Sequence, residues 1–208
     1  NNCMIKMSDR FVITGTSDGM LKEWDVINRK CVSTFPGHQG AVKCIANYDH
    51  ILYSCGEDRK LYRWSYKDGV IEKIVCLPAA PRSMDLSEDG ERILLGLGNC
   101  KIVELDTLDL RILKIYGEAV KLKYAEGLKY IHGHEKFVSI TKDRTLRLWH
   151  SGVDACEMIY GCAGNQHLTA VGYGHKRNCI YIAEGRDILE LDADTYEEKH
   201  RYEGHLGT

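Results

Sequence analysis

The chain has 208 residues, and its 28 lysines and arginines stand against 30 aspartates and glutamates, for a formal net charge of −2. A balance this close to neutral gives no support to bulk electrostatic binding of nucleic acid or of an acidic membrane surface. The hydrophobic fraction of 44% is typical of a globular chain. The longest apolar run, near Ile93–Leu97, is far shorter than the ~20 residues of a membrane-spanning helix.

The nine cysteines indicate a reducing compartment. They are odd in number and scattered, and no two form the C-x-x-C pair that zinc sites and redox motifs use. The sequence also has no Asn-x-Ser/Thr acceptor and no basic-then-apolar N-terminal segment. We therefore expect the protein in the cytosol or the nucleus.

A repeat of about forty residues organises the chain. Tryptophan follows similar four-residue segments at Trp24, Trp64 and Trp149, and leucine takes the same place at Leu105 and Leu191. The segments are Met20–Glu23, Lys60–Arg63 and Thr145–Leu148. We call these three tryptophans and two leucines the markers. They are separated by 40, 41, 44 and 42 residues, and spacings this even indicate five copies of one structural unit.

Other residues recur at fixed distances from the markers. Six residues before the tryptophans the sequence has Asp18, Asp58 and Asp143. Ten residues before them it has Thr14, Ser54 and Ser139, and a Gly37-His38 pair opens the second period.

Short apolar runs lie between these positions and are bounded by Asp-Gly, Gly and Asn signals, which favour tight hairpins. In chain order the runs are 11–14, 41–46, 51–54, 93–97, 137–140 and 180–183. We predict four short strands per period.

The segment Leu110–Tyr130 is ambiguous. Its apolar residues at Ile112, Ile115, Ala119, Leu122 and Ala125 have helical spacing, and Gly127 could end such a helix. The phase of the repeat instead predicts a last strand of one period, a loop near Gly117 and a first strand of the next. We follow the phase.

Together these motifs resemble the WD-repeat β-propeller family over essentially the whole chain. The resemblance implies an all-β fold of five four-stranded blades, at about residues 1–36, 37–77, 78–117, 118–162 and 163–204. Both ends of the chain fall at the same phase of the repeat, and most such propellers have more blades. We therefore expect an arc of a larger propeller that continues beyond these residues.

The resemblance also implies a structural role for the recurring polar residues. In that family a Trp, a Ser or Thr, a turn Asp and the His of the Gly-His pair form a hydrogen-bonded network that braces one blade. The corresponding residues are His38, Ser54, Asp58 and Trp64 in the second period, Thr14, Asp18 and Trp24 in the first, and Ser139, Asp143 and Trp149 in the fourth.

Several motifs resemble catalytic or ligand-binding sites, but each has a structural explanation. Gly15–Gly19 matches the G-x-S-x-G nucleophile elbow, yet that motif needs a following helix, and a strand is expected here. His132-Gly133-His134 lacks further metal ligands at suitable spacing, and Gly96-Leu97-Gly98 lacks the third glycine of a dinucleotide motif. We expect no enzyme activity, no cofactor and no metal.

Binding to other proteins through surface loops is the function that such a fold favours. Arg59, Arg144 and Arg186 each stand five residues before a marker, and guanidinium groups suit carboxylates and phosphates. One hypothesis is a basic rim that binds an acidic or phosphorylated segment of a partner. The competing interpretation is solvated turns whose charge Glu57, Glu184 and Asp187 dilute. The candidate rim comprises Arg59, Lys60, Arg82, Lys101, Arg144 and Arg186.

A narrower resemblance concerns residues 81–96, 102–106 and 134–149, which are similar to repeats of the echinoderm microtubule-associated-protein-like family. It implies a cytoskeletal alternative, with tubulin as a partner and the cytoskeleton or cilium as a location. A third alternative is a substrate receptor of a ubiquitin ligase, although the Trp-Asp-x-Arg ending of one such group is absent. The main prediction is a non-catalytic scaffold in a multi-protein complex.

Overall fold

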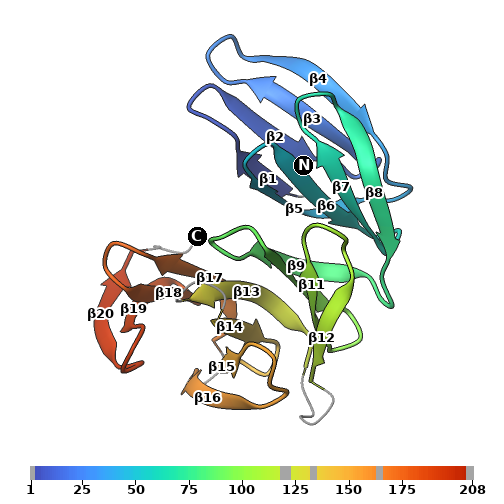
Figure 1. The fold of residues 1–208 in the computed structure, drawn as a ribbon. Coiled ribbons are helices and arrows are strands. Elements are labelled where there is room, and N and C mark those ends of the chain that lie inside the picture. The colour runs from blue at the N-terminus through green and yellow to red at the C-terminus, as the bar shows by residue number, and fades with distance from the viewer. Residues whose placement is uncertain (1–2, 118–122, 132–134, 163–165, 205–208) are drawn as a thin grey trace. The chain divides into compact units, whose positions relative to one another are not determined.

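The computed structural model describes residues 3–117, 123–131, 135–162 and 166–204. These residues form twenty strands in five antiparallel sheets of four strands each (Figure 1). The described part of the chain contains no helix, and therefore none that could span a membrane. The expected all-β fold with four strands per repeat is confirmed.

Each sheet takes four consecutive strands in chain order. The first holds β1 (Cys3–Lys6), β2 (Phe11–Gly15), β3 (Met20–Asp25) and β4 (Lys30–Pro36). The second holds β5 (Val42–Tyr48), β6 (Ile51–Gly56), β7 (Lys60–Ser65) and β8 (Val70–Cys76). The third holds β9 (Pro81–Leu86), β10 (Arg92–Leu97), β11 (Ile102–Asp106) and β12 (Ile112–Tyr116). The fourth holds β13 (Ala125–Ile131), β14 (Lys136–Thr141), β15 (Thr145–His150) and β16 (Cys156–Gly161), and the fifth β17 (Leu168–Gly174), β18 (Cys179–Glu184), β19 (Asp187–Asp192) and β20 (Glu198–Glu203).

The chain divides into two compact units, Asn1–Leu86 and Ser87–Thr208. The division falls inside the third sheet, so that β9 belongs to the first unit and the other strands of that sheet to the second.

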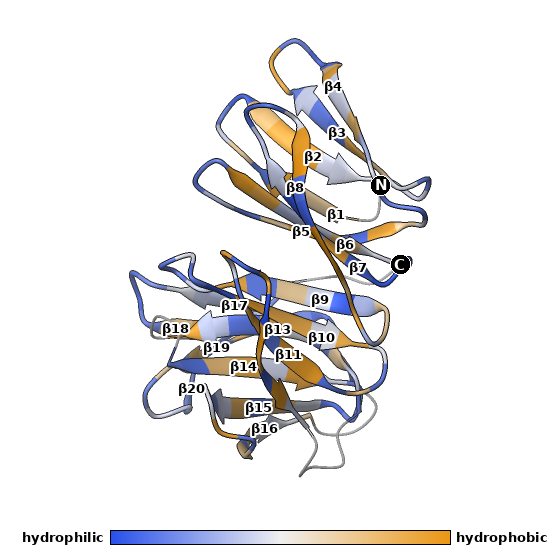
Figure 2. Ribbon diagram, turned by 45° about the vertical axis from the view of Figure 1, so that its right-hand side comes forward, coloured by the Kyte–Doolittle hydropathy of each residue, from blue (hydrophilic) through white to orange (hydrophobic). Residues whose placement is uncertain are grey.

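The core of each unit lies between neighbouring sheets. In the first unit, Ile13 and Leu21 of the first sheet pack with Val42, Leu52 and Trp64 of the second. In the second unit one cluster joins the third and fourth sheets and another joins the fourth and fifth. Since a sheet between two others is covered on both faces, its inner strands need apolar residues throughout rather than in alternation. In the fourth sheet, which packs with the third and the fifth, the sequence KFVSIT of β14 is buried at every position after Lys136, and Figure 2 gives the hydropathy along the strands.

The outer strands are more exposed and more polar. In β8, Val70, Glu72, Ile74 and Cys76 alternate with better-covered residues, as expected for a strand at the edge of a sheet. The pairing of the third and fourth strands shifts register beside the marker in four sheets, for example between Glu23 and Trp24. Such bulges increase the local twist of the strands.

The ambiguous segment 110–130 follows the phase of the repeat and not the helical spacing. Ile112–Tyr116 pairs with β11, and Ala125–Ile131 pairs with β14. The apparent helical stripe is divided between two strands, and Ala119 and Leu122 of that stripe lie outside the described residues. Ile112 remains 45% exposed because it lies on an outer strand.

Candidate functional site: turns and polar networks of the blades

The turns between the second and third strands of four sheets share one backbone conformation. Each is a three-residue turn closed by a hydrogen bond from its last residue to the carbonyl of the residue before the turn, at 2.9–3.4 Å. The last residue of each turn has a positive φ, as in the common three-residue hairpin. These residues are Gly19 (φ 87°), Arg59 (57°), Cys100 (68°) and Arg144 (67°).

Arg59 and Arg144 therefore occupy equivalent places in the second and fourth sheets. The carbonyl of Arg59 accepts a hydrogen bond from the backbone N–H of Leu77 at 2.7 Å, and that of Arg144 accepts one from Cys162 at 3.1 Å. In the first sheet Gly19 accepts in the same way from His38 at 3.2 Å. In each case the segment that leaves the blade holds the turn, so the turn presents its side chain from a fixed backbone.

Arg186 differs in structure from Arg59 and Arg144, although all three stand five residues before a marker. The turn of the fifth sheet has only two residues, because Glu184 pairs directly with Asp187. The positive φ falls on Gly185 at 58°, the first of the two, as in a type II′ turn. Arg186 thus stands the same number of residues before its marker as Arg59 and Arg144 do, but in a different backbone conformation.

Glu57, Glu184 and Asp187, the carboxylates that stand against the candidate rim in the sequence, form ion pairs with other cations. Glu57 pairs with Lys43 at 2.7 Å, and the hydrogen bond from Lys43 lowers the pKa of Glu57. Arg201 pairs at 3.1 Å with both Glu184 and Asp187. Arg59, Arg82 and Arg186 are exposed, whereas Lys60, Lys101 and Arg144 are partly buried.

The first unit contains Arg59, Lys60 and Arg82, and the second contains Lys101, Arg144 and Arg186. Arg82 lies within the strand β9 and not in a turn. Within the described residues, the structure thus offers one or more turn arginines in each unit.

In the second sheet, four polar side chains form one continuous hydrogen-bonded chain. The indole Nε1 of Trp64 donates to Ser54 Oγ at 2.9 Å, Ser54 Oγ lies 2.8 Å from His38 Nε2, and His38 Nδ1 lies 2.9 Å from Asp58 Oδ1. Asp58 also accepts from the backbone N–H of Gln39 and of Lys60. The side chain of His38 has no exposed surface, and Trp64 is 2% exposed. The chain therefore links the core to the rim turn.

The geometry favours a neutral His38. Burial lowers the pKa of His38, despite the opposing effect of Asp58. A neutral ring that carries its proton on Nδ1 donates to Asp58 and accepts from Ser54, so every group in the chain is satisfied. Although burial raises the pKa of Asp58, hydrogen bonds from His38 and the backbone hold it below its usual value.

The first and fourth sheets keep only the tryptophan bond. Trp24 Nε1 donates to Thr14 Oγ1, and Trp149 Nε1 donates to Ser139 Oγ, each at 2.9 Å. Asp143 is bonded within its own hairpin, to Thr141, Thr145 and Arg147. A hydrogen bond from Thr16 lowers the pKa of Asp18 in the same way.

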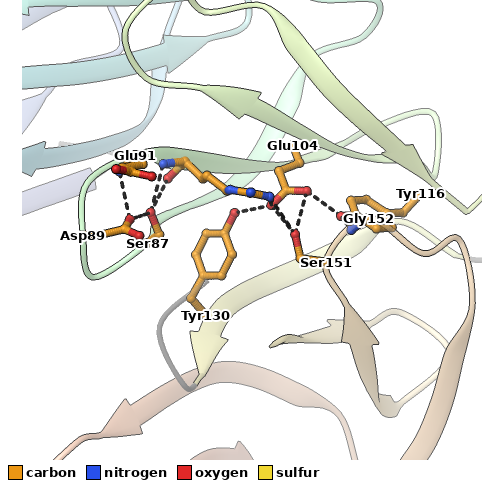
Figure 3. Close-up of polar contacts among 9 residues, drawn as sticks. Ser87, Asp89, Glu91, Glu104, Tyr116, Tyr130, Ser151 and Gly152 are labelled. Carbon is orange, nitrogen blue, oxygen red and sulfur yellow. Dashed lines mark hydrogen bonds and ion pairs between the residues drawn. The ribbon is translucent and has the colours of Figure 1, made fainter. Parts of the chain in front are cut away.

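A second kind of network, which the sequence analysis missed, crosses between blades. Glu104, one residue before its marker, is 1% exposed and accepts from Tyr116 at 2.5 Å, Tyr130 at 3.0 Å and Ser151 at 2.9 Å (Figure 3). Ser151 stands two residues after the marker of the next blade. Glu23 and Tyr66 occupy the same two places in the first unit, and the Tyr66 hydroxyl donates to Glu23.

We call this contact the clasp: the residue one before a marker meets the residue two after the next marker. Between the fourth and fifth sheets both places are apolar, since Leu148 and Ala193 are buried in one cluster. The two positions thus match in polarity wherever they lie within one unit. The sequence contains this signal as matching polarity at the two clasp positions, but the two positions belong to different periods and are not seen when one period is compared with another.

The catalytic resemblances have structural counterparts. Gly15–Gly19 lies in the hairpin from β2 to β3, and no helix follows it. Among the described residues no three His, Cys, Asp or Glu side chains gather as a metal site would require. His132-Gly133-His134 lies outside the described residues.

Comparison with known proteins identifies the class of fold. The family "WD domain, G-beta repeat" matches residues 29–65. The chain of a solved structure, the "Crystal Structure of Mitotic Checkpoint Complex", superposes with a TM-score of 0.79 at 12% identity, over 95% of this chain and 62% of that one. The fold is that of WD-repeat propeller blades, and residues 29–65 are one such repeat.

The chain also has curated sequence relatives over most of its length. Pre-mRNA-processing factor 17 of Saccharomyces cerevisiae is 23% identical over 150 residues, 69% of this chain and 32% of the relative. The APC/C activator protein CDH1 of the same yeast is 24% identical over 192 residues, 85% of this chain and 34% of the relative. The chain thus spans about a third of the length of these curated relatives. The WD-repeat resemblance is confirmed, whereas these comparisons give no support to a cytoskeletal or microtubule role.

Proposed function

We propose that this chain is part of a non-catalytic interaction scaffold that binds a protein partner through the turn arginines. The WD-propeller fold is generally a scaffold for protein interactions, and its relatives carry names from pre-mRNA processing and from APC/C activation. We accordingly place the protein in a multi-protein assembly of the nucleus or the cytoplasm.

The observation that carries the proposal is the state of the nearby carboxylates. Glu57, two residues before Arg59, pairs with Lys43, and Arg59 is exposed and forms no ion pair with a described residue. Around Arg186 the charge is less favourable, because the single cation Arg201 is shared by Glu184, Asp187 and Glu198. The backbone of Arg59 is held by a hydrogen bond from Leu77, so the turn loses little conformational entropy when it binds a partner. The partner that suits it is an acidic or phosphorylated segment, because a planar guanidinium can bond two oxygens at once.

The test compares charge reversal at the turns with the same reversal elsewhere. The rim variant carries Arg59→Glu, Arg144→Glu and Arg186→Glu. The control carries Arg29→Glu, Arg111→Glu and Lys176→Glu, three exposed residues at the opposite ends of the strands. Quantitative affinity purification of the full protein is expected to lose specific partners only with the rim variant. Identical partner sets for both variants would refute the proposal.

The two units can be tested one at a time. Arg59→Glu alters only the first unit, and Arg144→Glu alters only the second.

The chemistry of the partner segment can be tested by phosphatase treatment of the lysate. We expect the treatment to weaken the capture if the segment is phosphorylated, and to leave the capture unchanged if the segment is rich in carboxylates.

A further inference from the structure

The first unit contains a buried carboxylate without a cation. Glu23 on β3 is 9% exposed, and the hydroxyl of Tyr66 donates to it. In the described part of the chain no lysine, arginine or histidine lies within ion-pair distance of Glu23. A buried charge is costly unless it is paired as well as hydrogen-bonded.

A cavity of about 370 Å³ opens beside this carboxylate. Its lining includes Glu23, Ser33, Phe35, Tyr66, Lys67 and Asp68. Two carboxylates therefore face one lysine, and in the described residues no ion pair joins Lys67 to either of them. The turn 66–69 follows β7, so the cavity lies at the end of that strand opposite to the rim turn.

The equivalent clasp of the second unit supplies its own cation. Glu104 occupies the place of Glu23, and Nη1 of Arg92 donates to Glu104 at 3.2 Å. Arg92 on β10 lies opposite Asp106 on β11 in the strand register. Phe11 on β2 lies opposite Asp25 on β3 at the corresponding place of the first sheet. The first sheet thus has phenylalanine where the third has the arginine that neutralises the buried carboxylate.

We propose that this cavity binds the guanidinium group of an arginine side chain from a partner protein. The carboxylate of Glu23 supplies the counter-charge that Arg92 receives from Glu104, and the rings of Phe35 and Tyr66 supply faces on which a planar cation stacks. The volume is in the range of small-ligand sites and suits one side chain. The site is separate from the rim, so the two proposals stand or fall independently.

The probe is the peptide acetyl-Ala-Arg-Ala-amide, titrated into the full protein and followed by NMR chemical shifts. The matched peptides carry citrulline, which keeps the shape without the charge, or lysine in place of arginine. The arginine peptide is expected to shift signals near Glu23 and Tyr66, and the citrulline peptide is not. Equal shifts with citrulline would overturn the charge argument, and tighter binding of lysine would overturn the choice of a guanidinium.

Two variants test the residues. Glu23→Gln removes the charge and is expected to weaken the arginine peptide about tenfold or more. Phe11→Arg supplies an internal guanidinium, as Arg92 does, and is expected to block the peptide even if Glu23→Gln proves unstable. Asp9→Asn, at a side chain 98% exposed between β1 and β2, is the control and should bind as wild type does. Unchanged binding in Phe11→Arg, or no binding by the wild type, contradicts the proposal.

Discussion

At the scale of single residues, Ser54 holds the second blade together because two partners depend on its hydroxyl. Trp64 donates to it and His38 accepts from it, and neither partner has access to water to replace the bond. A buried polar group that loses its partner costs more than the bond itself contributes. The equivalent Thr14 and Ser139 each serve only a tryptophan.

We expect Ser54→Ala to lower the free energy of unfolding by about 2–3 kcal/mol, since it strands two buried groups. Ser139→Ala strands one group and should cost about half as much. Urea denaturation measures both, with the exposed turn variant Ser17→Ala as control. Equal losses for Ser54→Ala and Ser139→Ala would show that His38 does not depend on the network.

The pH dependence of stability follows from His38. Its pKa in the folded protein lies below the unfolded value of about 6.5. As the pH falls below about 6.5, the unfolded chain therefore binds a proton at this histidine before the folded chain does. The stability that a neutral His38 provides above that pH is lost as the pH falls through the folded pKa. Asp58 also has a lowered pKa, but its contribution is lost only below about pH 3.8.

Between pH 8 and pH 5, the wild-type free energy of unfolding should thus decrease by up to about 1.4 kcal/mol per pH unit below pH 6.5 from this group. His38→Gln lacks the titrating ring, and the same series should be flatter. A wild-type curve that rises toward pH 5, or one that His38→Gln reproduces, would contradict a neutral buried His38.

At the scale of elements, two of the turns place an arginine on a strained backbone. A non-glycine residue at positive φ costs about 1–2 kcal/mol, and Gly19 shows that glycine fits this turn. The arginines at Arg59 and Arg144 are therefore not the most stable choice for their positions. Glycine at these positions would remove that backbone cost.

Arg59→Gly should accordingly raise the unfolding free energy, by about 0.5–1 kcal/mol, while it weakens partner capture. Arg186→Gly is the matched control, since Arg186 does not have a positive φ and gains nothing from glycine. Thermal denaturation and capture are measured on the same samples. A destabilised Arg59→Gly would mean that the arginine contributes to the fold.

The strands and their order could be predicted from the sequence because the markers repeat in phase and each blade pairs locally. The place of Arg186 could not, because the same count back from a marker crosses a turn one residue shorter, between Glu184 and Asp187. The partners of Glu57 were also hidden, since Lys43 lies on a different strand. Spacing thus fixes the residues of the candidate rim but not their backbone or their charge environment.

At the scale of the whole molecule, each blade depends on contacts with its neighbours, as in other repeat proteins. The clasp makes this dependence specific, because Glu104 of one sheet needs Ser151 and Tyr130 of the next. It could not be read from one period alone, since its two residues belong to different periods. The apolar pair Leu148 and Ala193 shows that the chain solves the same contact without charge.

A double-mutant cycle tests the clasp. Glu104→Gln and Ser151→Ala should show a coupling of about 0.5–3 kcal/mol in unfolding free energy, because they share one hydrogen-bonded network. Glu104→Gln with Thr195→Ala, an exposed residue of the fifth sheet, should be additive within about 0.5 kcal/mol. Coupling of equal size in both cycles would remove the case for a specific contact between blades.

Site-specific photo-crosslinking tests most directly whether the turns bind a partner. The photoreactive residue benzoylphenylalanine replaces either Ser17, in the turn from β2 to β3, or Ile27, which is 69% exposed at the other end of β3. We predict partner crosslinks from position 17 that Arg59→Glu abolishes, and no effect of Arg59→Glu on any crosslink from position 27. Crosslinks from position 27 alone, or crosslinks from position 17 that persist in Arg59→Glu, would contradict this prediction.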